Sequence, residues 1–233
     1  PCNYIPVFIL CVLSKILERV VYNQLEKYLM ENSLLYNLQS GFRPAYSTDT
    51  CLIYLTDFIR GELDKRKGHY TGMVLLDLQK AFDTVDHEIL LHKLKSMGVN
   101  NSGLKWFQAY LTNRVQSTDV GGVLSKSAKI TCGVPQGSIL GPLLFLIYVN
   151  DMETSVKCKL LLYADDSALL VSGKNILEIQ EKLSQELQSV SNWLTENKLS
   201  LHLGKTESIL FGSKRKLRKH RELKISCNGV EIE

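Results

Sequence analysis

No stretch of this sequence is long and apolar enough to cross a membrane. The longest apolar runs cover residues 5–13 and 139–149, whereas a membrane helix needs about 20 residues. Gly141 and Pro142 also interrupt the second run. No charged segment or cleavage site precedes the first run, so we do not expect it to be a secretory signal. We expect a protein with no membrane partner.

Metal-binding patterns of cysteine and histidine are missing as well. The six cysteines, at positions 2, 11, 51, 132, 158 and 227, form no CxxC pair and none has a histidine at zinc-ligand spacing. His87 and His92 are five residues apart, so on a helix they diverge by about 140° and cannot share a zinc ion as an i, i+4 pair does. We expect reduced cysteines and an intracellular protein.

The sequence also lacks internal repeats, low-complexity segments and a Walker-type phosphate loop, because no Gly-Lys-Ser/Thr follows residues 133–137. Its 233 residues are 45% hydrophobic and 22% charged. These values are typical of one ordered domain, or one domain with a lobe. The chain starts at Pro1 and ends in an expected strand, so we expect it to be part of a longer protein.

Positive charge is concentrated near the C-terminus. Residues 214–224 hold seven Lys or Arg and one Glu, although the net charge of the whole chain is only +4. A surface that binds a polyanion is one interpretation. A solvated charged segment is the other.

Apolar periodicity predicts an α+β fold in which helices cover an antiparallel sheet. Ser14 is the expected N-cap of the first helix, and Asp86 is the expected N-cap of a helix that ends before Gly98. Helices are expected over residues 14–31, within 47–66, over 86–97, 104–111 and 175–196, and after 135–138. Strands are expected over 72–77, as a pair over 115–120 and 128–132, as a hairpin over 160–171, and around the Asn228-Gly229 turn.

Asp165 and Asp166 are adjacent acids between two apolar runs, in LLLYADDSALLV. Neighbouring side chains of a regular strand point to opposite faces, so the pair fits best at the tip of a tight hairpin. There the repulsion between the carboxylates calls for a cation, and Mg²⁺ binds carboxylates together with substrate phosphates. The alternative is an ordinary turn, where Asp is common.

Asp77 ends a second apolar run, MVLLD, and is expected at the edge of the same sheet. Acids at two neighbouring strand ends can hold two metal ions about 4 Å apart, which stabilise the attacking and leaving oxygens of phosphoryl transfer. The alternative is a solvated strand end. Asp86 suits a helix cap and Asp83 follows Phe82, so both rank below Asp77.

Three motifs stand in a specific order: LDLQKAFD at 76–83, GVPQGSILGP at 133–142 and YADD at 163–166. Together they closely resemble the palm motifs of reverse transcriptases, and in detail those of LINE-type, non-LTR retrotransposons. The resemblance covers nearly the whole chain. It implies a right-hand polymerase with an antiparallel palm sheet packed on helices, with residues of about 1–70 mainly fingers, about 71–233 mainly palm, and the thumb missing.

The resemblance also implies an activity and its partners. The expected reaction is RNA-directed DNA synthesis, which adds dNTPs to a DNA primer 3′-hydroxyl on an RNA template. Two Mg²⁺ ions, or possible Mn²⁺ substitutes, are implied. The implied catalytic and metal-binding acids are Asp77, Asp165 and Asp166. The implied nucleotide-binding residues are Arg43, Phe82 as a steric gate against the 2′-hydroxyl, Gln136, Gly137 and Lys205, and the nucleic-acid-binding residues are Tyr163, Lys214, Arg215 and Lys216.

Two alternatives to polymerisation remain open. Ile5 and Phe8 stand where relatives usually carry Arg and Ser, which favours a truncated, inactive remnant that at most binds template–primer. A palm-type nucleotide cyclase also places acids on a sheet, but it leaves the GVPQGS turn unexplained.

Overall fold

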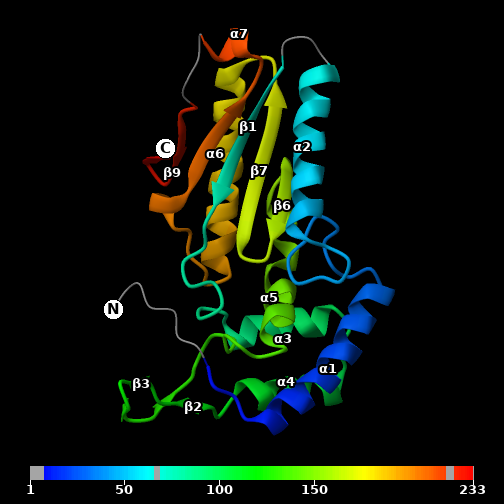
Figure 1. Ribbon diagram of the computed structural model, residues 1–233, viewed down its shortest axis with the longest axis vertical. Coiled ribbons are helices and arrows are strands. Elements are labelled where there is room, and N and C mark those ends of the chain that lie inside the picture. The colour runs from blue at the N-terminus through cyan, green and yellow to red at the C-terminus, as the bar shows by residue number, and fades with distance from the viewer. Residues whose placement is uncertain (1–7, 66–68, 219–222, 233) are drawn as a thin grey trace. The chain divides into compact units, whose positions relative to one another are not determined.

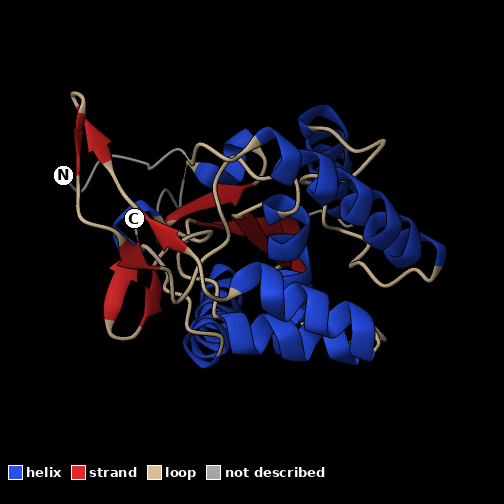
Figure 2. Ribbon diagram, turned by 90° about the horizontal axis from the view of Figure 1, so that it is seen from below, coloured by secondary structure: helices blue, strands red, loops and turns tan. Residues whose placement is uncertain are grey.

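The computed structural model describes residues 8–65, 69–218 and 223–232. It mixes helices and strands throughout (Figure 2). Residue contacts divide the chain into two compact units, each built from two segments. The first unit is Pro1–Leu34 with Lys80–Val149, and the second is Leu35–Gln79 with Asn150–Glu233.

The second unit contains a four-stranded antiparallel sheet (Figure 1). Its order is β6 (Lys159–Tyr163), β7 (Asp166–Gly173), β1 (Tyr70–Leu76) and β8 (Glu207–Phe211). β1 pairs with both β7 and β8. This arrangement confirms the predicted antiparallel sheet and the predicted hairpin of β6 and β7.

Helices cover both faces of this sheet. On one face, Met73 and Leu170 form a buried cluster with Ile59 of α2 (Thr48–Lys65). On the other face lies α6 (Ile176–Glu196), whose apolar stripe is buried. A Cβ on Gly72 would come within 2.6 Å of the Ile179 side chain, so only glycine lets α6 approach β1 this closely. Burial of both faces explains why the strands read as continuous apolar runs.

The rest of the second unit consists of short elements. These are η1 (Asn150–Ser155), η2 (Leu203–Lys205), α7 (Lys214–Leu217), β9 (Ile225–Cys227) and β10 (Val230–Ile232). β9 and β10 pair around Asn228 and Gly229, whose φ angles are 50° and 77°. The Asn-Gly hairpin predicted from the sequence is therefore confirmed.

The first unit is mainly helical. It contains α1 (Val12–Glu31), α3 (His87–Ser96), α4 (Asn101–Leu111) and α5 (Gly141–Val149). Two short strand pairs lie between α4 and α5: β2 (Val115–Gln116) with β5 (Ala128–Lys129), and β3 (Asp119–Val120) with β4 (Val123–Leu124). All residues of α5 except Pro142 are buried, so this helix forms the centre of its unit.

One predicted helix cap is confirmed and another is wrong. The Asp86 carboxylate accepts hydrogen bonds from the backbone of Glu88 and Ile89, both at 3.0 Å. In contrast, α1 begins at Val12, with Cys11 at the N-cap position. The Ser14 hydroxyl lies inside the helix and donates to Glu18 at 3.4 Å, because Val12 and Leu13 before it already adopt helical geometry.

Two expectations from composition are also addressed by the described residues. None of their helices is long and apolar enough to span a membrane. The five cysteines in this part of the chain are all free thiols.

Candidate active site

The β6–β7 hairpin turns sharply at the two adjacent acids. Tyr163 pairs with Asp166 as the last position of the ladder, which leaves Ala164 and Asp165 as the turn. Ala164 has a φ of 57°, in the left-handed region that costs a residue with a Cβ about 1–2 kcal/mol. The sequence-based prediction of a tight hairpin tip for Asp165 and Asp166 is confirmed.

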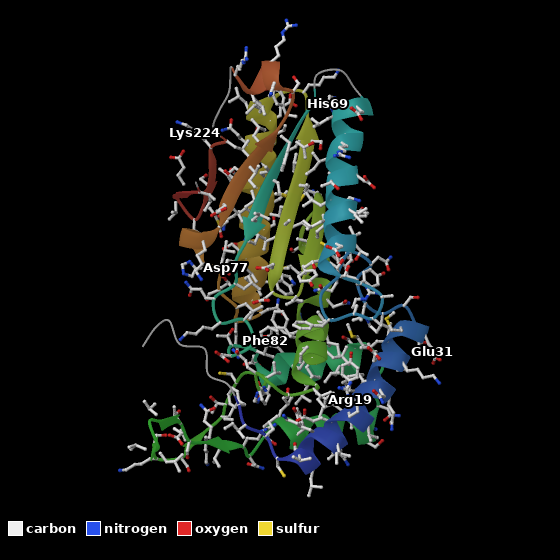
Figure 3. All side chains as sticks on the ribbon, in the orientation of Figure 1. Arg19, Glu31, His69, Asp77, Phe82 and Lys224 are labelled. Atoms are coloured by element: carbon white, nitrogen blue, oxygen red, sulfur yellow. The ribbon has the colours of Figure 1, made fainter. Side chains whose placement is uncertain are left out.

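Asp77 lies at the same end of the sheet. Leu76 is the last residue of β1 and pairs with Ser167, so one further step along this register brings Asp77 opposite Asp166. Figure 3 labels Asp77 at this end of β1 and His69 at the other. The Asp77 side chain is 33% exposed. The three acids therefore lie at the same end of the sheet, with Asp77 directly after β1 and the other two at the hairpin tip.

The carboxylates influence one another electrostatically. Burial raises the pKa of Asp166 above its ordinary value of 3.8, and the negative charges of Asp165 and Asp77 raise it further. Among the described residues, Lys205 forms an ion pair with this group of acids, with its Nζ 3.6 Å from Asp77 Oδ2. Both side chains are substantially exposed, so this pair contributes little stability. The negative charges of Asp77, Asp165 and Asp166 thus repel one another, and a cation bound beside them would relieve this repulsion.

Lys205 reaches this end of the sheet because its segment is tied to the end of β1. His202 donates its backbone N–H to the Asp77 carbonyl at 2.8 Å, and Gln79 donates to the Ser200 carbonyl at 2.8 Å. Leu78 and Leu201 form an isolated antiparallel bridge. The structure therefore places Lys205, as well as the three acids, in the second unit and beside Asp77.

The donor set suits a hard divalent cation. Three carboxylates supply the oxygen ligands that Mg²⁺ prefers, and Mg²⁺ usually binds one or two carboxylates and completes its shell with water and phosphate oxygens. Among the described residues, no three His, Cys, Asp or Glu side chains form a ready-made metal cage. The acids therefore fit Mg²⁺ by donor chemistry, with substrate oxygens needed to complete its coordination.

Replacing Asp166 by Asn is expected to stabilise the metal-free chain at neutral pH. Since folding raises the pKa of this carboxyl group, its ionised form costs folding free energy. The cost is absent below pH 3.8 and grows as the pH rises through the folded-state pKa. Thermal melts should show a higher Tm for Asp166→Asn at pH 7, with the difference shrinking towards pH 4.

Mg²⁺ should narrow the difference in Tm between Asp166→Asn and the unsubstituted chain at pH 7. It should raise the Tm of the unsubstituted chain more, because a ligand that binds the folded state stabilises it. Asp57→Asn, at an exposed position of α2, is the matched control and should leave the Tm nearly unchanged. A lower Tm for Asp166→Asn at pH 7 would contradict the prediction.

Arg43 organises the loop before α2. Its Nη1 donates to the carbonyls of Tyr36 at 2.8 Å and Gln39 at 3.0 Å, and its guanidinium lies 4.4 Å from the centre of the Tyr46 ring. Arg43 thus has a structural role in addition to the nucleotide contact predicted for it.

Tyr163, at the end of β6, is half-buried.

Phe82 and Gln136 lie in the first unit, on two segments that pack together. Val134 donates its backbone N–H to the Phe82 carbonyl at 2.8 Å, and Gln136 Nε2 donates to Asp83 Oδ1 at 3.0 Å. A Cβ on Gly133 would lie 2.7 Å from the Asp83 carbonyl oxygen, and Gly133 has a φ of 88°. Glycine is therefore required at the start of the GVPQGS segment for it to dock on residues 82–85.

The Phe82 ring stacks on Phe145 of α5, with centroids 4.5 Å apart and ring planes at 30°. Phe145 is fully buried, whereas Phe82, labelled in Figure 3, is only half-buried. Gly137 is exposed, with a φ of 101°. Because Phe82 is only half-buried, its position is compatible both with the predicted steric gate and with a core aromatic.

Lys214 and Arg215 lie on α7 and are exposed. The side chain of Lys216 and residues 219–222 fall outside the described part of the chain, as does Ile5. The exposed basic side chains are therefore free of the sheet core of their unit.

Sequence reasoning missed two buried polar residues that support these motifs. Glu18, 1% exposed, accepts hydrogen bonds from the Ile139 backbone at 2.7 Å and the Tyr110 hydroxyl at 3.1 Å. Gln39, 2% exposed, contacts the hairpin turn. Neither residue stands out in a single sequence, because a polar side chain in an amphipathic segment is usually assigned to the solvent side.

Solved structures of telomerase share this fold. Telomerase from Candida tropicalis, in complex with a fragment of telomeric RNA, has a TM-score of 0.64 at 16% identity over 87% of this chain and 34% of its own. An apo form of that telomerase, truncated from its C-terminal domain, has a TM-score of 0.63 over 94% of this chain. At such low identity the likeness concerns the fold, an antiparallel sheet packed on helices.

The chain belongs to the reverse transcriptase (RNA-dependent DNA polymerase) family, whose model matches residues 3–231. It is 31% identical over 90% of its length to an RNA-directed DNA polymerase from mobile element jockey of Drosophila funebris. It is 33% identical over 83% to a probable RNA-directed DNA polymerase from transposon BS of Drosophila melanogaster. It spans only 23% and 22% of these relatives. The predicted family, with its relation to non-LTR retrotransposons, is confirmed.

Proposed function

We propose that this chain provides the polymerising part of a non-LTR retrotransposon reverse transcriptase, with fingers over about residues 1–70 and palm over about 71–233. The observation that supports this most strongly is the convergence of Asp77, Asp165 and Asp166 at one end of the sheet, where their charges raise the pKa of Asp166. Lys205 is an ion-pair partner of one of these acids, Asp77, and clustered carboxylates are suited to hold catalytic metal.

Each of these residues then has a role in nucleotide addition. The primer 3′-hydroxyl attacks the α-phosphate of a dNTP and pyrophosphate leaves. Asp77 and Asp165 would hold the Mg²⁺ ions with assistance from Asp166, and bound Mg²⁺ supplies charge stabilisation at the reacting oxygens. Lys205, beside Asp77, would donate a proton to the leaving pyrophosphate, and Arg43 would contact the triphosphate.

Residues of the first unit would select and orient the nucleotide. Gln136 and Gly137 form the turn assigned to nucleotide and template contact, where the absence of a side chain on Gly137 permits close approach. Phe82 would exclude a ribose 2′-hydroxyl. Tyr163 and the basic residues from Lys214 onward are assigned to the primer and template.

Primer extension tests the proposal directly. The chain is incubated with an RNA template, an annealed DNA primer, dNTPs and Mg²⁺, with and without a chelator. Extension that requires Mg²⁺ supports polymerisation. Because the chain spans only 23% and 22% of the two relatives named above, binding without turnover is the second candidate. Saturable binding of template–primer with no extension would favour it.

The basic segment makes a separate prediction about binding. Replacing Lys214, Arg215 and Lys216 together by Ala is expected to flatten the salt dependence of template–primer binding. Each lost phosphate contact makes the negative slope of log K against log salt shallower by about 0.7–0.9. The magnitude of the slope should therefore decrease by about 2–3 in the triple variant. Binding is measured by fluorescence anisotropy over a series of salt concentrations.

The control for this prediction removes the same charge elsewhere. Lys27, Lys174 and Lys182 are exposed lysines, and their joint replacement by Ala should change the slope much less. Equal slopes in both triple variants would show that the basic segment is a solvated charged segment that does not contact the template–primer.

A further inference from the structure

The segment before Arg43 lies along β6 and ends at the hairpin tip. β6 is an edge strand of the sheet. Leu162 donates its backbone N–H to the Leu38 carbonyl at 2.9 Å, and Ser40 donates to the Leu162 carbonyl at 2.8 Å. Gln39 and Leu162 form the corresponding parallel bridge. Residues 38–41 thus continue the sheet beside the strand that leads into the two acids.

The Gln39 side chain contacts the turn itself. Its Oε1 accepts hydrogen bonds from the backbone N–H of Ala164 at 3.1 Å and of Gly41 at 2.8 Å. Ala164 is the turn residue held in the left-handed region. One buried amide oxygen therefore fixes the backbone of the turn and ties it to the segment alongside.

Two further features show that this contact is tight and specific. A Cβ on Gly41 would overlap the backbone nitrogen of Ala164, so the two backbones touch. Gln39 Nε2 is buried, and no partner for it is found among the described residues. Buried polar atoms usually have hydrogen-bond partners. Within the described part of the chain, only the acceptor of the Gln39 side chain, Oε1, has them, so we assign the function of this side chain to its contact with the turn.

We propose that Gln39 is the positioning residue of the metal site: its Oε1 holds the Ala164 turn so that Asp165 and Asp166 face the bound metal. The inference rests on the proposed function, because it assigns these acids to metal. In this role Gln39 would touch neither the metal nor the nucleotide. It acts through the backbone of Ala164, whose left-handed conformation would otherwise relax towards the commoner regions of φ/ψ space.

Gln39→Met removes the acceptor and keeps the length of the side chain. Tyr36→Phe is the matched control, because the Tyr36 hydroxyl donates to the Leu160 carbonyl at 2.8 Å and so ties the same segment to the same strand away from the turn. In metal-free samples followed by NMR, amide hydrogen exchange at Ala164 should be about 10-fold faster in Gln39→Met, as expected for loss of a protecting hydrogen bond. Exchange at Ala164 should be unchanged in Tyr36→Phe.

Mn²⁺ then serves as the probe of the metal site. In the unsubstituted chain it should broaden the amide signals of residues 165–167, and in Gln39→Met about 10-fold more Mn²⁺ should be needed. Unchanged exchange at Ala164, equal effects in both variants, or no broadening in the unsubstituted chain would overturn the inference. These readouts need no turnover, so failure of primer extension would count against the proposed function alone.

If the chain extends a primer, steady-state kinetics provide a third measurement. Gln39→Met should lower kcat about 10-fold and raise the Mg²⁺ concentration for half-maximal rate, with the KM for dNTP within about twofold. A merely destabilising change would lower the active fraction without altering the Mg²⁺ requirement, and that result would contradict a positioning role.

Discussion

Asp165→Asn is expected to abolish primer extension, with a loss of about 1,000-fold or more in kcat. Asn keeps the size of the side chain and can still accept hydrogen bonds at the turn, but it removes the negative charge that holds a divalent ion. Charge stabilisation by a metal ion is worth several kcal/mol, and each 1.36 kcal/mol is tenfold in rate. The rate is measured by single-turnover extension on an RNA template at saturating dNTP, and Asp77→Asn is expected to behave in the same way.

The control for the loss of charge is Asp57→Asn, which removes an exposed carboxylate from α2 in the same unit and should retain full activity. Template–primer affinity should fall little in Asp165→Asn, because the acids would contact the reacting phosphates through metal. Extension by Asp165→Asn or Asp77→Asn at a rate near that of the unsubstituted chain would refute the metal role of these residues.

Much of this site was predictable because its residues are marked by local contrasts in the sequence. Charged residues between apolar runs identify Asp77, Asp165 and Asp166, and the period-2 geometry of a strand implies a turn at the adjacent pair. Helices α2 and α6 pack on the two faces of the sheet, so apolar runs marked the buried strands clearly. The Asp86 cap and the Asn228-Gly229 turn were predictable for the same reason, since each depends on two to four neighbouring residues.

The supporting contacts were not predictable because they join residues far apart in the chain. Gln39 meets Ala164 across 125 positions, and Glu18 meets Ile139 across 121. Nothing in the local sequence distinguishes such a buried polar side chain from a solvated one. The misplaced Ser14 cap has a different cause, because Val12 and Leu13 extend the helix before Ser14.

The role of Phe82 depends on whether only its buried face, or also its exposed part, contributes to function. The ring face on Phe145 belongs to the core of the first unit, whereas the part that remains exposed would contact a nucleotide sugar in the steric-gate role. A purely structural aromatic and a steric gate therefore predict different results for the same truncation. Stability changes in both cases, but sugar selectivity changes only if the exposed half contacts the nucleotide.

Phe82→Val is expected to reduce discrimination against ribonucleotides by about 10- to 100-fold. Val stays apolar but no longer fills the space that a 2′-hydroxyl would occupy, and a steric contact of this kind is worth about 1–3 kcal/mol of selectivity. The measurement is the ratio of kcat/KM for dGTP and GTP in primer extension. Phe58→Val, which truncates a half-buried aromatic ring packed against the sheet core of the second unit, is the control for lost stability and should leave the ratio unchanged. If Phe82→Val lowers the Tm but keeps the parent ratio, the ring serves only to pack on Phe145, and sugar selection must reside in another residue.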